Sequence, residues 1–313
     1  MFLIERQCEP RRGHQPATDG TYGFTGAWHH APVTDQAERY DRIAEGYARW
    51  WAPVIAPSAR AVLDRFDGAF DARPIRLLDV GSGTGTLSLA ALQRWPEAQV
   101  DAIDASREMV LATRAGAAEL PEAAARLRAV TAFADALPFP DDTFDAVVSS
   151  FVLQLVPDRF RALREIRRVL RPGGRLAYVT WVSDTRRWKA DDVLDDLLDE
   201  LGVPEEDDDE PASAAGAGDL PSVESAATGL RRAGFRDVTA EAARLTYQFD
   251  PESYTGFIAE FDEQALVESL EPEMRRRFER ELPARLARLD PEDLRIDSPI
   301  AYATGRKPQR PKG

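Results

Sequence analysis

The sequence predicts an α/β fold in which a mostly parallel, seven-stranded sheet carries helices on both faces, with an added helical cap. The first observation is I-R-L-L-D-V at residues 75–80, a short buried strand followed at once by glycines at positions 81, 83 and 85. The second is the helical pattern that begins directly after them, because strand, glycine turn and helix open a nucleotide-binding sheet. The third is the composition: 313 residues, 43% of them apolar, suit one large domain with an appendage.

Charge and composition exclude several classes of protein. With a net charge of −14, the chain lacks the basic surface that nucleic acids require. No apolar run approaches the ~20 residues of a membrane-spanning helix, and the first residues lack the apolar centre of a signal peptide. The single cysteine, Cys8, excludes an intramolecular disulfide and a thiolate metal cluster. We therefore expect a cytoplasmic monomer or homodimer that binds neither nucleic acid nor membrane.

Residues 1–34 carry Gly, Pro, Thr and His without periodicity, which predicts a flexible N-terminal extension. This extension holds all the histidines of the chain, His14, His29 and His30. Paired histidines suggest a metal site, but neither a carboxylate nor a third histidine stands at ligand spacing. We therefore favour a loosely ordered tail and expect no metal.

Residues 35–70 are predicted to form lid helices. Thr34 or Asp35 is expected to cap the first helix, Pro53 to end it, and a second helix is expected at about residues 58–66. One face carries apolar residues at steps of three or four: Tyr40, Ile43, Tyr47 and Trp51. Two interpretations of this face are open, ordinary core packing and a lid whose aromatic rings exclude water from a ligand.

The nucleotide core is predicted at residues 71–182. Its second strand, at residues 99–103, ends in Asp104. A carboxylate at that position can accept two hydrogen bonds from a ribose diol, a feature shared by NAD and S-adenosylmethionine sites. In the next helix, Met109 either lies against an adenine face or fills the core.

A third strand is predicted at residues 127–133, followed by A-D-A-L-P-F-P. In this stretch, Asp135 can accept a hydrogen bond from the amino group of adenine, and the amide of Ala136 can donate to a ring nitrogen. The core then continues with a strand at 144–149, a helix that ends at Leu170 or Arg171, a Pro-Gly-Gly turn, and a strand at 175–181.

Beyond the core, the pattern predicts further segments. Ser222 is expected to cap a core helix. The segments are an acidic helix and mobile loop at 183–221, which includes the acidic run 205–210; a core helix and sixth strand at 222–249; a helical cap insertion at 250–295; and a seventh strand and basic tail at 296–313.

The order of these motifs resembles the class I S-adenosylmethionine-dependent methyltransferases, in particular the type-11 group of ubiquinone/menaquinone biosynthesis and related small-molecule enzymes. The motifs are G-x-G-x-G, an acidic strand end, D-A-x-P-F, F-D-x-V and L-R-P-G-G, and together they cover the nucleotide core. The resemblance implies a Rossmann-like sheet with strand order 3-2-1-4-5-7-6 and strand 7 antiparallel. It also implies S-adenosylmethionine as cofactor, S-adenosylhomocysteine as product and a small-molecule methyl acceptor.

The resemblance carries over to a set of cofactor-binding residues. They are Asp79, Gly81, Ser82, Gly83, Gly85, Asp104, Ala105, Met109, Asp135, Ala136 and Ser150. The sequence departs from the family at Gln154, where many relatives place a histidine, and it has no (N/D)-P-P-(Y/F) signature of DNA and protein-amide N-methyltransferases.

The predicted function is therefore in-line SN2 transfer of a methyl group to an O, N or C atom of a small molecule. No general base stands out; the candidates are Tyr40, Tyr47, Gln154 (which can only orient) and an unidentified carboxylate of the cap. One alternative is an inactive methyltransferase fold that serves as a binding or regulatory module. The other is an NAD(P)-dependent oxidoreductase, which is disfavoured because Thr86 replaces the sixth-position glycine and lysines are few.

Overall fold

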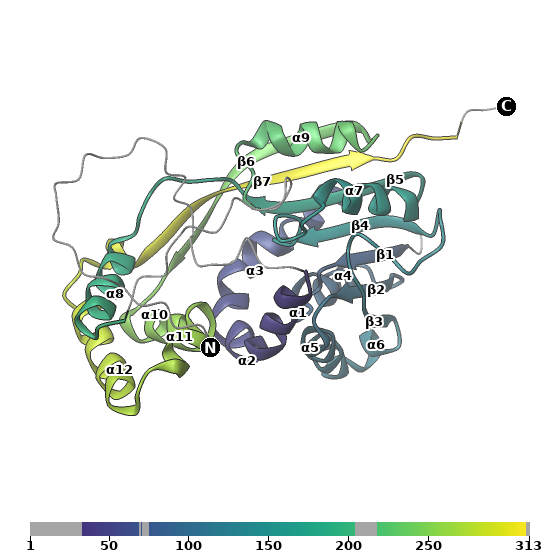
Figure 1. Ribbon diagram of the computed structural model, residues 1–313. Coiled ribbons are helices and arrows are strands. Elements are labelled where there is room, and N and C mark those ends of the chain that lie inside the picture. Colours follow the sequence, from purple (N-terminus) through teal and green to yellow (C-terminus); the bar gives the residue numbers. More distant parts are fainter. Residues whose placement is uncertain (1–32, 69, 71–74, 204–217, 311–313) are drawn as a thin grey trace.

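The computed structural model describes residues 33–68, 70, 75–203 and 218–310 (Figure 1). Cys8, the three histidines and the acidic run 205–210 lie outside the described residues, as does most of the predicted N-terminal extension. None of the described helices combines the length and apolar character needed to cross a membrane.

The central sheet has seven strands in the order β3-β2-β1-β4-β5-β7-β6, which confirms the predicted order. Strands β1 to β5 pair in parallel, and β7 is antiparallel to both β5 and β6. The strands are β1 (Arg76–Val80), β2 (Gln99–Asp104), β3 (Leu127–Thr131), β4 (Phe144–Ser150), β5 (Leu170–Trp181), β6 (Arg236–Gln248) and β7 (Arg295–Arg306).

Helices cover both faces of the sheet because successive apolar residues of a strand point to opposite sides. Leu77 and Leu78, neighbours in β1, belong to two separate cores. Helices α3 (Ala52–Arg60) and α4 (Thr86–Arg94) pack on the first, and α7 (Arg159–Val169) and α9 (Val223–Arg232) pack on the second. The remaining core helices are α5 (Arg107–Ala118) and α6 (Pro121–Ala124).

Two predicted boundaries in the core can be compared with the structure. Ser222 caps α9 as expected, because its hydroxyl accepts from the amide of Ser225. The predicted end of the helix before the fifth strand was wrong: α7 ends at Val169. Leu170 instead has extended backbone angles and pairs with Phe144, so β5 begins there and passes a register shift before its regular ladder.

The N-terminal helices follow one another almost without interruption, and their winding changes along the way. The elements are α1 (Val33–Arg42), α2 (Ala44–Gly46), the π-helix η1 (Tyr47–Trp51) and α3, followed by the 3₁₀ turn η2 (Leu63–Phe66). The expectation that Pro53 ends the helix was wrong. Pro53 lies in the first turn of α3, where an amide hydrogen has no intrahelical partner to lose, so the chain continues helically to Arg60.

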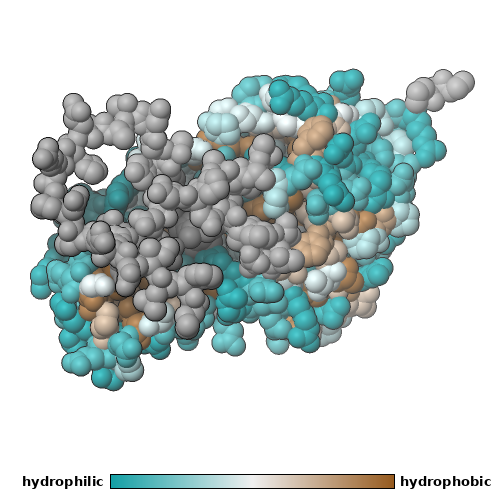
Figure 2. All heavy atoms as spheres, in the orientation of Figure 1, coloured by the Kyte–Doolittle hydropathy of each residue, from teal (hydrophilic) through white to brown (hydrophobic). Residues whose placement is uncertain are grey.

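The cap gathers at one end of the molecule, to the left in Figure 1. It comprises α8 (Lys189–Glu200), α10 (Pro251–Phe257), the π-helix η3 (Ile258–Asp262), α11 (Gln264–Ser269), α12 (Pro272–Leu286) and the 3₁₀ turn η4 (Pro291–Leu294). Helix α8 packs on α12, and η3 packs on η1. Figure 2 shows a mostly hydrophilic surface around these described elements, with smaller hydrophobic areas.

Candidate functional site

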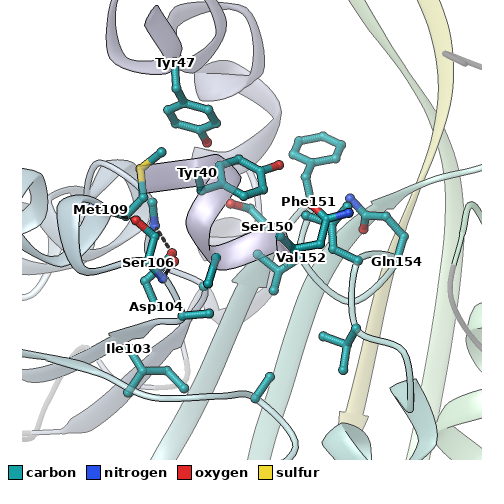
Figure 3. Close-up of a pocket in the computed structure, with 18 of the residues that line it drawn as sticks. Tyr40, Tyr47, Ile103, Asp104, Ser106, Met109, Ser150, Phe151, Val152 and Gln154 are labelled. Carbon is teal, nitrogen blue, oxygen red and sulfur yellow. Dashed lines mark hydrogen bonds between the residues drawn. The ribbon is translucent and has the colours of Figure 1, made fainter. Parts of the chain in front are cut away.

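A cavity of about 160 Å³ lies at the carboxyl ends of β1, β2 and β4. This is the edge at which open α/β sheets bind ligands. We call its sheet side the floor, which includes Gly81, Gly83 and residues 103–106, and its helical side the roof. In Figure 3 the roof residues Tyr40 and Tyr47 lie across the cavity from Ile103 and Asp104 of the floor. The roof comprises Tyr40, Tyr47, Trp51, Phe261 and Asp262.

Most of the predicted site residues come together here. Those that line the cavity are Tyr40, Tyr47, Gly81, Gly83, Asp104, Ala105, Met109, Asp135, Ser150 and Gln154. Asp79, Ser82, Gly85 and Ala136 are not part of its lining.

The glycine turn brings bare backbone to the cavity. Gly81 has φ +74°, and a Cβ there would lie 2.2 Å from a methyl group of Val152. Gly83 has φ +53°, and a Cβ there would lie 3.2 Å from the hydroxyl oxygen of Tyr47. A side chain at Gly81 would therefore clash with Val152, one at Gly83 would enter the space below Tyr47, and both would force an unfavourable backbone conformation.

Asp104 is a preoriented acceptor at the end of β2. One carboxylate oxygen accepts from the amide of Gly83 at 2.8 Å, and the other accepts from the amide of Ser106 at 3.0 Å. Burial raises the pKa of Asp104 to about 6, although these amide donors act to lower it. Each oxygen keeps a further lone pair for a ligand hydroxyl, so the geometry suits the predicted ribose contact.

Asp79 lies in β1 behind the glycine turn. It is fully buried, and one of its oxygens accepts from the hydroxyl of Ser88 at 2.6 Å. Burial raises the pKa of Asp79 to about 7. The other oxygen is buried without a hydrogen-bond partner among the described residues. This carboxylate supports the turn from below and does not line the cavity.

The stretch after β3 is placed differently from the prediction. The amide of Ala136, expected to donate to an adenine ring nitrogen, donates instead to the carbonyl oxygen of Phe133 at 3.1 Å, and Ala136 is exposed. Asp135 does line the cavity, 3.9 Å from the Nε of Arg161. Phe133 and Ala134 also contribute there, which leaves Asp135 as the polar group at this end.

The other two cofactor-binding candidates outside the cavity lining lie on the far side of the turn. The buried hydroxyl of Ser82 is 3.2 Å from that of Thr113, and Gly85 occupies the N-cap position of α4 with φ +91°. Both residues thus serve the shape of the turn, which local glycine spacing could not distinguish from ligand contact.

Aromatic rings from three parts of the chain enclose the cavity. The rings of Trp51 and Phe261 stack with centroids 5.7 Å apart, and Tyr47 meets Phe261 at 5.6 Å. On the adjacent wall, Phe151 and Trp181 lie 4.5 Å apart. The N-terminal aromatic face packs on the core, which confirms the packing interpretation, and it also lines the cavity; the lid interpretation stays a prediction.

The predicted candidates for a general base do not fit that role. Burial raises the pKa of Tyr40 to about 12 and raises that of Tyr47 further, so both phenols stay protonated near neutral pH. They can donate hydrogen bonds but cannot take up a proton. The amide oxygen of Gln154 accepts from the hydroxyl of Thr180 at 3.0 Å, which fixes its orientation.

Two carboxylates that the sequence did not single out complete the site. Asp41 of α1 accepts from the hydroxyl of Ser106 at 2.6 Å and from the amide of Glu108 at 3.1 Å, and so ties the lid to the start of α5. Asp262 of η3 lines the cavity, and its Oδ1 is buried without a hydrogen-bond partner among the described residues. Burial, reinforced by the neighbouring Glu263, raises the pKa of Asp262 well above its ordinary value. Asp262 is a carboxylate of the cap that lines the cavity, so it is a candidate for the cap carboxylate that the sequence left unidentified.

Residues 78–178 match the family model described as a methyltransferase domain. This part of the chain is a class I methyltransferase domain of the type-11 group. The match spans the glycine turn, Asp104 and Asp135. S-adenosylmethionine is the cofactor of this methyltransferase domain.

Two known methyltransferases resemble a little under half of this chain. A malonyl-[acyl-carrier protein] O-methyltransferase of Halorhodospira halophila is 36% identical over 149 residues, 48% of this chain and 46% of that protein. A ubiquinone/menaquinone biosynthesis C-methyltransferase UbiE of Methylobacterium nodulans is 44% identical over 144 residues, 44% of this chain and 53% of that protein. The chain thus spans about half the length of these curated relatives.

A solved structure extends the likeness of fold beyond this domain. The [4+2]-cyclase SpnF aligns with a TM-score of 0.56 at 22% identity, covering 90% of this chain and 98% of that one. At this identity the likeness concerns the fold alone.

Proposed function

We propose that this protein is an S-adenosylmethionine-dependent methyltransferase that acts on a small-molecule acceptor. The observation that carries the proposal is the cavity at the strand ends, with a glycine turn and Asp104 on the floor and an aromatic roof above them. The floor suits the cofactor, because Gly81 and Gly83 bring bare backbone to the cavity and Asp104 presents an acceptor. The roof excludes water from the same space.

Each part of the site has a task in the proposed reaction. The bound cofactor supplies a methyl group that is already activated by the sulfonium. Gly81 and Gly83 admit the ligand close to the backbone, Asp104 accepts from its ribose hydroxyls, and Asp135 accepts from its adenine amino group. Tyr40 and Tyr47 donate hydrogen bonds and, with Trp51, hold the acceptor in line in a dry space. Such positioning accounts for up to ~7–11 kcal/mol of barrier in favourable cases.

Further expectations from the sequence remain proposals: a cytoplasmic monomer or homodimer with no nucleic-acid partner. The names of the relatives describe O-methylation of malonyl-[acyl-carrier protein] for one protein and C-methylation in ubiquinone/menaquinone biosynthesis for the other.

Calorimetric titration of the purified full chain with S-adenosylmethionine, S-adenosylhomocysteine and NAD tests the proposal. We expect the two sulfur nucleotides to bind at micromolar concentration and NAD not to bind. A folded protein that binds neither sulfur nucleotide would contradict the proposed function. Binding without methyl transfer to any acceptor in a broad panel would favour the alternative of a binding or regulatory module.

A further inference from the structure

Among the described residues that line the cavity, the charged side chains are all acidic, while Arg39, Arg159 and Arg161 lie just behind the lining. Four aspartates line the cavity, Asp104, Asp135, Asp219 and Asp262, whereas no described residue of its lining carries a basic side chain. Asp104 and Asp135 belong to the floor end and are assigned to the cofactor. Asp219 is compensated in part by Arg159, which acts to lower its pKa. Asp262 thus remains as a roof carboxylate that the cofactor assignment does not use.

Arg39 compensates the carboxylate charge of Asp262 only in part. Arg39 donates at 3.3 Å to the backbone carbonyl oxygen of Asp262 and attracts its carboxylate, but burial and the charges of Glu263 and Asp191 outweigh that attraction. The Oδ1 atom is buried and without a hydrogen-bond partner among the described residues. A buried oxygen without a hydrogen-bond partner is stabilised most by a ligand that brings a hydrogen-bond donor or a positive charge.

The rings beside Asp262 favour the same kind of ligand. Phe261 precedes it in η3, stacks on Trp51 and meets the edge of Tyr47, and all three rings line the cavity. Faces of aromatic rings attract cations through their quadrupole, most strongly when the site is desolvated. The Phe261 ring already does so within the chain, since the guanidinium carbon of Arg39 lies 6.0 Å from its centroid. A carboxylate next to aromatic rings is therefore a pocket for an organic cation.

Two other acceptor classes fit these charges poorly. A carboxylate or phosphate ester would enter a cavity with four aspartates and no basic side chain among the described lining residues. A phenol must be largely deprotonated before its oxygen can attack. The same aspartates disfavour the negative charge that this deprotonation creates. An amine develops positive charge as it is methylated, which the aspartates stabilise.

We propose that the methyl acceptor is an organic amine whose nitrogen lies against the carboxylate of Asp262, beside the rings of Trp51 and Phe261. This inference rests on the proposed function and adds the substrate class. In the reaction the ammonium gives one proton to Asp262, and the freed lone pair of nitrogen forms the new N–C bond. The C–S bond breaks, its electron pair stays on sulfur, and the product leaves as a methylated ammonium.

The test compares matched probes that differ in charge. The full chain is first saturated with S-adenosylhomocysteine and then titrated with phenethylamine, phenethyl alcohol and hydrocinnamate, and with the larger set tryptamine, tryptophol and indolepropionate. We expect the amine of at least one set to bind about tenfold tighter than its alcohol, and neither carboxylate to bind.

Variants of Asp262 assign the preference to this residue. Asp262→Asn should remove the preference for the amine while S-adenosylhomocysteine binding changes by less than about twofold. Asp262→Glu keeps the carboxylate, so this variant should retain the preference for the amine. Asp196→Asn makes the same change on the exposed face of α8, away from the cavity, and should leave both ligands unaffected.

The outcomes separate this inference from the proposed function. If S-adenosylhomocysteine binds but the alcohols or carboxylates bind as well as the amines, or if no amine binds, the amine inference is wrong and the methyltransferase proposal stands. The inference is also wrong if Asp262→Asn keeps the full preference for the amine. If S-adenosylhomocysteine itself does not bind, the proposed function fails first.

Discussion

The floor and the roof of the cavity are built on different principles. The floor comes from β1, β2 and the turns that follow them, where backbone amides of Gly83 and Ser106 hold Asp104 in place. The roof joins α1 and η1 to η3, which lie more than two hundred positions further along the chain, and packs Tyr47 against Phe261. The floor is thus specified by local sequence and the roof by long-range packing. We expect changes in the floor to affect the cofactor and changes in the roof to affect the acceptor.

The largest effect is expected for Gly83→Val. The new side chain enters the space between the turn and Tyr47 at a residue with φ +53°, so S-adenosylhomocysteine affinity should fall about a hundredfold or more. The free energy of unfolding should fall by only ~1–2 kcal/mol. Calorimetry and chemical denaturation measure the two effects.

Gly202→Val is the matched control for this change. Gly202 has φ +73° but nothing within 4 Å of its Cβ position, so the control carries the backbone strain without the obstruction. It should lose similar stability and keep cofactor affinity. Normal cofactor binding by Gly83→Val would show that the floor has been misassigned.

Asp104→Ala should weaken S-adenosylmethionine binding by about tenfold or more, because the ribose loses its acceptor and two backbone amides lose theirs. Asp196→Ala, on the exposed surface of α8, should bind normally. An unchanged dissociation constant for Asp104→Ala would remove the ribose assignment while leaving the glycine turn untouched.

Cofactor binding should also depend on pH through Asp104. Its pKa is raised to about 6, and ribose hydroxyls donate to the deprotonated form, so binding is strong above pH 6 and weakens as the pH falls through 6. S-adenosylhomocysteine should bind about tenfold more weakly at pH 5 than at pH 7. Asp104→Asn should show a flatter profile. If the affinity of the wild type and that of Asp104→Asn depend on pH in the same way, a group other than Asp104 causes the pH dependence.

The smallest effect is expected at the junction between floor and roof. Asp41→Asn weakens the acceptor of the Ser106 hydroxyl and the Glu108 amide. The contact between α1 and the start of α5 should become less favourable by about 1 kcal/mol. Amides of η1 should exchange faster with deuterium, and cofactor affinity should fall about twofold to fivefold. Glu45→Gln on the exposed side of α2 serves as control. Unchanged exchange in η1 would show that ring packing alone holds the lid.

The sequence predicted the floor well because its signals are local. The glycine turn and the strand that ends in Asp104 follow from short segments, and the sheet order follows from the family resemblance that the order of such motifs carries. The sequence-based predictions were wrong where the role of a residue depends on contacts with residues outside its own segment. Spacing could not show that Asp79 faces away from the cavity beneath the turn, or that the Ala136 amide is taken by Phe133.

Local sequence patterns predicted even less of the roof, because its residues come from distant segments of the chain. The aromatic face of the N-terminal helices was visible as a pattern, but its partner Phe261 and the carboxylate of Asp262 lie in an insertion without a motif. Pro53 was misread because its effect depends on its position in a helical turn, which the winding of η1 determines. Only the folded chain brings these segments together.

The long ribbon of β6 and β7 has a mechanical consequence. β7 pairs with β5 only from Ile300 onward, whereas residues 295–298 pair with β6 alone and lead into the cap. The cap therefore stands on a two-stranded arm that is continuous with the central sheet. Two-stranded ribbons twist more readily than wide sheets. We expect any opening of the cap to occur by twisting of this two-stranded arm about its own axis, while the central sheet that carries the floor of the cavity stays in place.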